Sequence, residues 1–155
     1  MFSPRSQVTA ESPYPVPNGA DGVAEWYRRR LGWHVEVEGG EVRLPLTGGL
    51  VAFEVPVHLA EAVLTRLADL GATRPALRTG ERGDRVAFLC DANDSVFTQA
   101  DMPVGVAHLR SPKSLRLPGT PTAWFSAPEP DRGWLPSAGA VLHAVRRTLA
   151  AARAV

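Results

Sequence analysis

The spacing of apolar side chains divides the chain into helical and extended segments. In three stretches the apolar residues recur at intervals of three, four and seven or eight positions, which is the period of an amphipathic helix. The predicted helices span residues 21–31, 58–70 and 137–152. Asp21 and Ser137 are suitable N-cap residues, and Gly32 and Gly71 directly follow the first two helices as stop signals.

Shorter segments have the pattern of β-strands. In Trp33–Glu38 apolar and polar side chains alternate, which predicts a strand with one buried face. Leu50–Val55 and Arg85–Cys90 are nearly continuous apolar runs, typical of central strands. Further extended segments are predicted at residues 41–46, 95–99, 104–109 and 122–126. The segment 111–121 contains three prolines and is predicted to be a loop.

The order of these elements predicts one small α+β domain. The chain has 155 residues, of which 45% are hydrophobic, so it can form a packed core. We expect a mixed, mostly antiparallel sheet flanked by helices in residues 20–155. Residues 1–19 hold four prolines and are predicted to be a flexible arm.

Several classes of protein are excluded or disfavoured by what the sequence lacks. No apolar run approaches the roughly 18 residues that a membrane span needs. The first residues do not show the basic and apolar pattern of a secretory signal. Cys90 is the single cysteine, so neither an internal disulfide nor a cysteine-cluster metal site is possible. We therefore expect a cytoplasmic protein that does not enter a membrane.

The net charge of +1 conceals an uneven distribution. Residues 1–102 carry 10 basic and 14 acidic side chains, a balance of −4, whereas residues 103–155 carry 7 and 2, a balance of +5. A basic C-terminal part is either a solvated basic face or a surface that contacts the phosphate groups of a nucleic acid or a nucleotide. The candidate phosphate-binding residues in this part are Arg110, Lys113, Arg116, Arg146 and Arg147.

Four features occur in an order that is known from a protein family. They are the strand LVAFEVP (50–56) with the helix HLAEAVLTRLADLG (58–71), the segment RTGERGDRVAFL (78–89), Asp101, and SPKSLRLPGTPTAWFSAP (111–128). This order resembles the bacterial primase/polymerase (Prim-Pol) domain of the archaeo-eukaryotic primase superfamily, over roughly residues 21–126. The stretch AEWYRRRLGWHVEV (24–37) is similar to the helix, Gly-Trp pair and strand with which that family begins.

The resemblance implies a two-metal nucleotidyltransferase site that this sequence matches incompletely. In the family, carboxylates at positions i and i+2 of a strand and a third carboxylate hold divalent metals, and a histidine contacts the nucleotide phosphate. Glu54 matches the first carboxylate and Asp101 the third, but Pro56 stands at position i+2. Arg85 stands at the histidine position, and Ser114 matches the later loop, which makes both of them candidate phosphate contacts. We therefore predict no intact catalytic residue and no metal.

The sequence leaves three functions open. The first is a catalytically degenerate primase/polymerase-like domain that acts as a nucleic-acid- or nucleotide-binding or regulatory protein and needs no cofactor. The second is a protein-interaction module that uses the N-terminal arm and the motif GWLPSAG (133–139). The third is an active enzyme that uses Glu54, Asp101 and Arg85, either as a residual, metal-dependent nucleotidyltransferase or in an unrelated activity.

Several of the named residues also have a plainer structural interpretation. Glu54 is then a carboxylate on an edge strand or a partly exposed strand carboxylate, and Arg85 is a surface arginine that pairs with Asp84 or Glu81. Trp124 is then a core residue or a loop anchor. The partners of these side chains in the folded protein distinguish the two interpretations.

Overall fold

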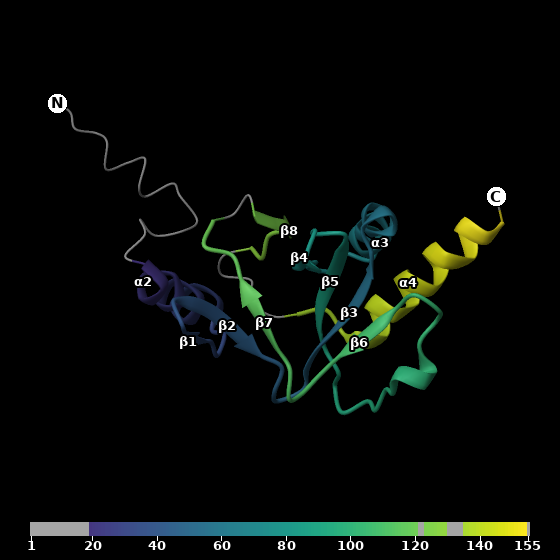
Figure 1. The fold of residues 1–155 in the computed structure, drawn as a ribbon. Helices are drawn as coiled ribbons and strands as arrows, with labels where there is room; N and C mark the ends of the chain where they lie inside the picture. The colour runs from purple at the N-terminus through teal and green to yellow at the C-terminus, as the bar shows by residue number, and fades with distance from the viewer. Residues whose placement is uncertain (1–18, 121–122, 130–134, 155) are drawn as a thin grey trace.

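A computed structural model describes residues 19–120, 123–129 and 135–154 and has an α+β fold (Figure 1). Its helices are α2 (Gly19–Trp26), α3 (Val57–Asp69) and α4 (Ala138–Arg153), with a π-helical turn η1 (Tyr27–Leu31) and a 3-10 turn η2 (Gln99–Asp101). Its strands are β1 (Glu36–Glu38), β2 (Glu41–Pro45), β3 (Leu50–Pro56), β4 (Ala76–Thr79), β5 (Arg85–Asp91), β6 (Ala107–Leu109), β7 (Ser114–Leu117) and β8 (Trp124–Ser126). The predicted arm at residues 1–19 lies outside the described residues, apart from Gly19, which begins α2.

The strands form two sheets rather than one. The smaller has three strands in the order β1-β2-β7, and the larger has five in the order β6-β3-β5-β4-β8. Every pair of neighbouring strands is antiparallel, which confirms the predicted α+β class. The central pair, β3 and β5, runs in register from Leu50 opposite Asp91 to Pro56 opposite Arg85.

The five-stranded sheet is the middle layer of the molecule. Successive side chains of β3 and β5 point to opposite faces, and both faces are covered. Phe53 and Phe88 pack with α3 and α4 on one face, whereas Ala52 and Leu89 pack with α2, η1 and the three-stranded sheet on the other. Burial on both faces explains why the sequences of β3 and β5 are nearly continuous apolar runs.

The predicted helices are present, with small changes at their ends. The Ser137 Oγ accepts a hydrogen bond of 3.1 Å from the Ala140 backbone N–H, as expected of the α4 N-cap. Gly32 ends η1 in the left-handed conformation at φ 70°. Asp21 was the wrong N-cap, because α2 already begins at Gly19 and Asp21 lies in its first turn. None of the described helices is both long enough and apolar enough to cross a membrane.

Two predicted strands, 33–38 and 104–109, are shortened, the second to β6, and a third, 95–99, is absent. Only Glu36–Glu38 of the segment 33–38 is a strand, because Trp33 leaves the left-handed turn at Gly32 and stacks on Tyr27 with ring centroids 5.8 Å apart. All three residues of β1 are exposed, Val37 included, so the predicted buried face of this strand is wrong. The segment 95–99 is not a strand, and it leads into η2, whose first turn is capped by hydrogen bonds between Thr98 and Asp101. In the segments 33–38 and 95–99 a local side-chain contact takes the place of the expected strand pairing.

Two strands were missed by the sequence analysis. One is β4, which is only four residues long. The other is β7, which lies inside the segment predicted to be a loop. Its prolines, Pro112 and Pro118, flank the strand and leave its backbone N–H groups free to pair with β2. Leu115 and Leu117 are buried opposite Leu44 and Val42, so tertiary packing makes this segment extended.

A buried hydrogen-bond chain connects the N-terminal helical part to both sheets. The Tyr27 hydroxyl donates to the Pro118 carbonyl at 2.7 Å and accepts from the Trp124 Nε1–H at 3.0 Å. Tyr27 is fully buried and Trp124 is 5% exposed. Trp124 is therefore a core residue, as its plainer interpretation predicted.

Candidate functional site

Strand pairing brings three polar side chains together on the face of the five-stranded sheet opposite α3 and α4. Glu54 lies on the central strand β3, Arg85 on β5 and Thr79 on β4, where Thr79 pairs directly with Arg85. The Arg85 Nε donates to Glu54 Oε1 at 2.7 Å, and the Thr79 hydroxyl donates to Glu54 Oε2 at 2.6 Å. Both carboxylate oxygens therefore already accept a strong hydrogen bond.

The rest of the Arg85 guanidinium holds backbone groups. Its Nη2 donates to the Glu54 carbonyl at 3.1 Å and to the Gly105 carbonyl at 2.8 Å. Arg85 therefore connects β5 to β3 and to the loop that precedes β6. Its partner is Glu54 rather than Asp84 or Glu81. Glu54 is no edge-strand residue, since β3 lies between β5 and β6 and the side chain is only 16% exposed.

Asp101, the other candidate carboxylate, has a different set of partners. Its Oδ2 accepts from the Thr98 backbone N–H at 3.0 Å and from the Thr98 hydroxyl at 2.9 Å. These bonds hold the pKa of Asp101 below its usual value, the backbone N–H contributing most and the hydroxyl next. Glu54 and Asp101 are thus satisfied by separate neighbours. Among the described residues, no three His, Cys, Asp or Glu side chains are placed to hold a metal ion together.

Beside this cluster a cleft of about 540 Å³ opens between the two sheets. It is lined by the end of β4 (Arg78, Thr79, Gly80), by β7 (Leu115, Arg116, Leu117), and by Pro118, Gly119 and Ala123. Arg78 and Arg116 line the cleft from opposite sheets. The Arg78 side chain leaves β4 on the face of Val86, toward α3 and α4, and that of Arg116 leaves β7 on the outer face of the three-stranded sheet. The Arg78 guanidinium is held by stacking 5.2 Å above the Phe125 ring and by donating to the Gly83 carbonyl at 3.2 Å. Thr79 joins the cleft to the Glu54–Arg85 pair.

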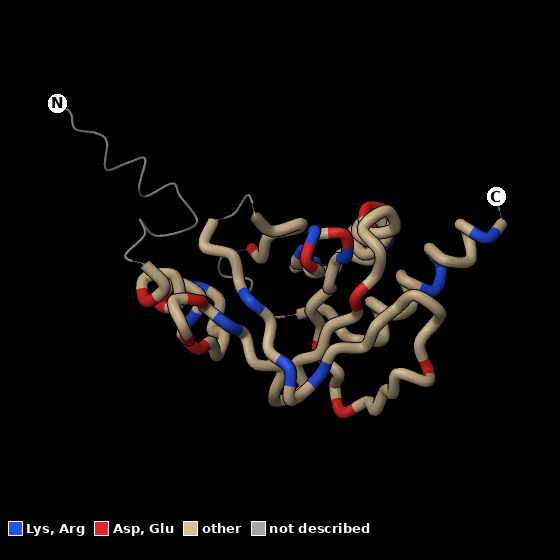
Figure 2. Tube along the Cα trace, in the orientation of Figure 1, with Lys and Arg blue, Asp and Glu red and all other residues tan. Residues whose placement is uncertain are grey.

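A strip of basic side chains leads to this cleft along the three-stranded sheet. The basic strip consists of Arg43 on β2, Arg110 and Lys113 in the turn between β6 and β7, and Arg116 on β7. Figure 2 shows these blue positions following β2, β7 and the turn. Glu41 pairs with Arg43 at 2.9 Å and with Arg116 at 3.4 Å, and Glu36, which lies opposite Arg43 in the β1–β2 register, adds a second carboxylate to this face. The Ser114 hydroxyl accepts from the Arg43 Nε at 2.9 Å, which orients that guanidinium.

The remaining candidates, Arg146 and Arg147, lie elsewhere. Both are on α4, which covers the other face of the five-stranded sheet. The Arg146 Nη2 donates to the Asp101 carbonyl at 3.2 Å. The basic C-terminal part predicted from the sequence is therefore divided between two separate surfaces.

Sequence reasoning missed two basic residues of the site, Arg43 and Arg78. Both belong to the acidic part of the sequence, so a balance of charge along the chain assigned them to the wrong group. The alternation of polar and apolar residues in β2 was the available signal, because it places Arg43 on the face opposite Val42 and Leu44.

No protein-family model, curated protein or solved structure matches this chain. The function must therefore be inferred from the geometry described above. Two features carry that inference: the carboxylate closed by Arg85 and Thr79, and the basic cleft beside it. Gly133 and Trp134 of the motif GWLPSAG (133–139) lie outside the described residues, and its later part leads into α4, with Ser137 as the N-cap.

Proposed function

We propose that the chain is a catalytically degenerate primase/polymerase-like domain that binds the phosphates of a nucleic acid and does not transfer nucleotides. The observation that carries the proposal is the closed arrangement of Glu54, Arg85 and Thr79 beside a basic cleft. The resemblance assigns Glu54 to a divalent metal. In this chain a guanidinium occupies the carboxylate instead.

The chemistry of this cluster disfavours a metal. A divalent cation needs free oxygen lone pairs, and both Glu54 oxygens already accept short hydrogen bonds. Pro56, two residues further along the same strand, has no side-chain donor atom. The charge of Arg85 would also repel a cation that approached Glu54. These three features support a non-catalytic role.

The surroundings of the cluster favour a polyanionic partner. The cleft volume of about 540 Å³ lies within the range of ordinary ligand sites. Arginine presents a planar fork that matches phosphate oxygens, and Arg78 and Arg116 stand at the two borders of the cleft. The basic strip extends this charge away from the cleft, as a chain of successive phosphates requires.

The binding part of the proposal can be tested by fluorescence anisotropy with a labelled single-stranded oligonucleotide at several salt concentrations. We expect salt-sensitive binding, and the double variant Arg78→Gln, Arg116→Gln should bind more weakly with a salt slope smaller by about one for each lost phosphate contact. Arg82→Gln is the matched control, because Arg82 is exposed in the β4–β5 turn and does not line the cleft. Absence of binding by the unmodified protein at low salt would refute a nucleic-acid partner and favour the protein-interaction module.

The catalytic part has an independent test. A primer-extension assay with Mn²⁺ should give no product with the unmodified protein. Template-dependent product that is lost in Glu54→Gln would show that the protein is a residual nucleotidyltransferase. That result would contradict the non-catalytic assignment and leave the binding result unaffected.

A further inference from the structure

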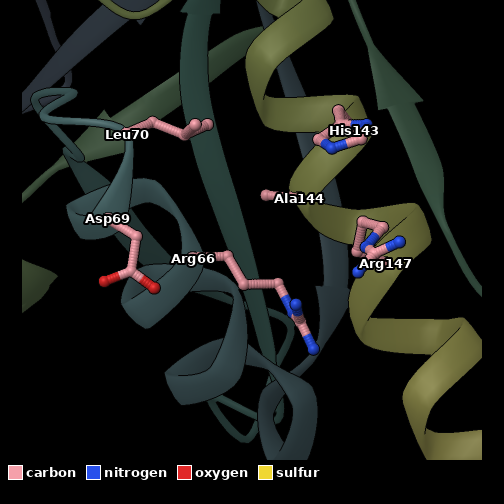
Figure 3. Close-up of a pocket in the computed structure, with 6 residues that line it drawn as sticks. All are labelled: Arg66, Asp69, Leu70, His143, Ala144 and Arg147. Atoms are coloured by element: carbon pink, nitrogen blue, oxygen red, sulfur yellow. The ribbon is translucent and has the colours of Figure 1, made fainter.

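A second basic site lies between α3 and α4, away from the cleft. A cavity of about 150 Å³ is lined by Arg66, Asp69 and Leu70 of the α3 end and by His143, Ala144 and Arg147 of α4 (Figure 3). It shares no lining residue with the cleft between the sheets. The five-stranded sheet separates these helices from the three-stranded sheet.

The cavity results from the helical spacing of these residues. His143 and Arg147 are four positions apart, so they lie on the same face of α4. Ala144, next to His143, is nearly fully buried and small, and it leaves space opposite α3. Figure 3 shows the Arg66 side chain extending from α3 across this space toward α4.

The guanidinium of Arg66 is incompletely satisfied. Its Nε is buried and has no hydrogen-bond partner among the described residues. A buried N–H group of a charged side chain normally has an acceptor, because leaving it without one is costly. No acidic side chain of the described part of the chain supplies that acceptor. Asp69 forms no ion pair with Arg66 or Arg147 there, and its carboxylate points away from the Arg66 guanidinium in Figure 3.

We propose that this cavity binds a phosphate group. Two guanidinium forks can each donate two hydrogen bonds to phosphate oxygens, and the His143 imidazole, which is exposed beside them, can donate a further one. The lining carries two arginine charges against the single carboxylate of Asp69, so it is net positive, as a phosphate requires. At about 150 Å³ the cavity is smaller than the usual sites for whole organic ligands, so it takes the phosphate and leaves the attached group outside.

The test is a titration of the ¹⁵N-labelled protein with inorganic phosphate, followed by NMR at constant ionic strength with chloride as the reference anion. The expected result is a saturable shift of amide signals from the C-terminal end of α3 and the middle of α4. A second titration with glycerol 3-phosphate identifies the source: tighter binding than inorganic phosphate indicates a phosphate ester, and equal or weaker binding indicates the free ion. Shifts no larger than those caused by chloride, with both probes, would overturn the proposal.

Variants distinguish specific phosphate binding in this cavity from general attraction of an anion to positive charge. Arg147→Gln and Arg66→Gln should each weaken phosphate binding about tenfold, the effect expected for loss of a charge-assisted hydrogen bond. Arg66→Lys keeps the charge but removes the planar fork that matches two phosphate oxygens, and it should also bind more weakly than the unmodified protein. Arg153→Gln, an exposed position at the end of α4, is the matched control and should bind normally. If Arg66→Lys binds phosphate as well as the unmodified protein, or if Arg153→Gln weakens binding as much as Arg66→Gln, the proposal of a specific phosphate site is wrong.

Discussion

The contact between Glu54 and Arg85 can be measured by a double-mutant cycle. The cycle uses Glu54→Gln, Arg85→Met and the combined variant. Glutamine retains the shape of the carboxylate and can still accept from Thr79, and methionine retains most of the length of the arginine side chain. The cycle therefore isolates the charge-assisted hydrogen bond of 2.7 Å between the two side chains.

The structure sets the expected magnitude. The side chains of Glu54 and Arg85 are 16% and 30% exposed, so the pair is neither open to water nor fully buried. Exposed ion pairs contribute about 0.2–1 kcal/mol, and removing one partner of a buried pair costs about 3–5 kcal/mol. We expect a coupling free energy of about 1–2 kcal/mol. Arg85→Met alone should cost about 2–3 kcal/mol, because it also removes the bonds to the Glu54 and Gly105 carbonyls.

Urea unfolding of the four proteins at neutral pH, followed by circular dichroism, gives the required free energies of unfolding. Arg82→Met serves as the control, and its exposed side chain should change stability by less than about 0.5 kcal/mol. A coupling below about 0.3 kcal/mol would mean that Arg85 does not hold the Glu54 carboxylate. The argument that Glu54 is closed to a metal would then fail.

Three further predictions concern stability. Tyr27→Phe should lower the free energy of unfolding by about 1–3 kcal/mol, because it leaves the Trp124 Nε1–H and the Pro118 carbonyl without their buried partner; a loss under about 0.5 kcal/mol in urea unfolding would contradict this. Burial, and to a smaller extent the charge of Arg110, lower the pKa of His108 below 6.5 in the folded protein. The neutral imidazole therefore contributes stability in full above pH 6.5, and this contribution is lost as the pH falls through the folded pKa. His108→Phe should remove this part of the pH dependence of stability. If the urea midpoints of the variant and the unmodified protein fall equally between pH 7.5 and pH 5, the prediction is wrong. Ser137→Ala should cost about 1 kcal/mol through loss of the α4 cap, whereas Ser137→Asp should restore it, as thermal unfolding would show.

The sequence predicted the elements whose pattern is local. The helical spacing in 58–70 and 137–152 and the apolar runs of 50–55 and 85–90 correspond to α3, α4, β3 and β5 within a few residues. In each of these segments the buried apolar residues recur with the period of the element itself, so its type can be predicted from the local sequence. The strand β7 was missed because its prolines resemble those of a loop, and only the pairing of Leu115 and Leu117 with β2 makes it extended.

The candidate site was predicted in part. The motif comparison selected Glu54 and Arg85, and these residues do form one cluster. It also selected Asp101, which instead caps η2 through Thr98. It did not select Thr79 as the second partner of Glu54, although Thr79 lies in one of the quoted motifs, because the contact depends on the pairing of β4 with β5.

By itself the sequence determined the α+β class, the main helices and central strands, and the presence of Pro56 two residues after Glu54. These properties depend on local periodicity and on the identity of single residues. Only the tertiary structure decided which charged residues are neighbours. It pairs Glu54 with Arg85, places Arg78 and Arg116 along one cleft, and places Arg66 and Arg147 in the lining of one cavity. The physical reason is that side-chain electrostatics acts over a few ångströms in space, whereas these partners are separated by many residues along the chain.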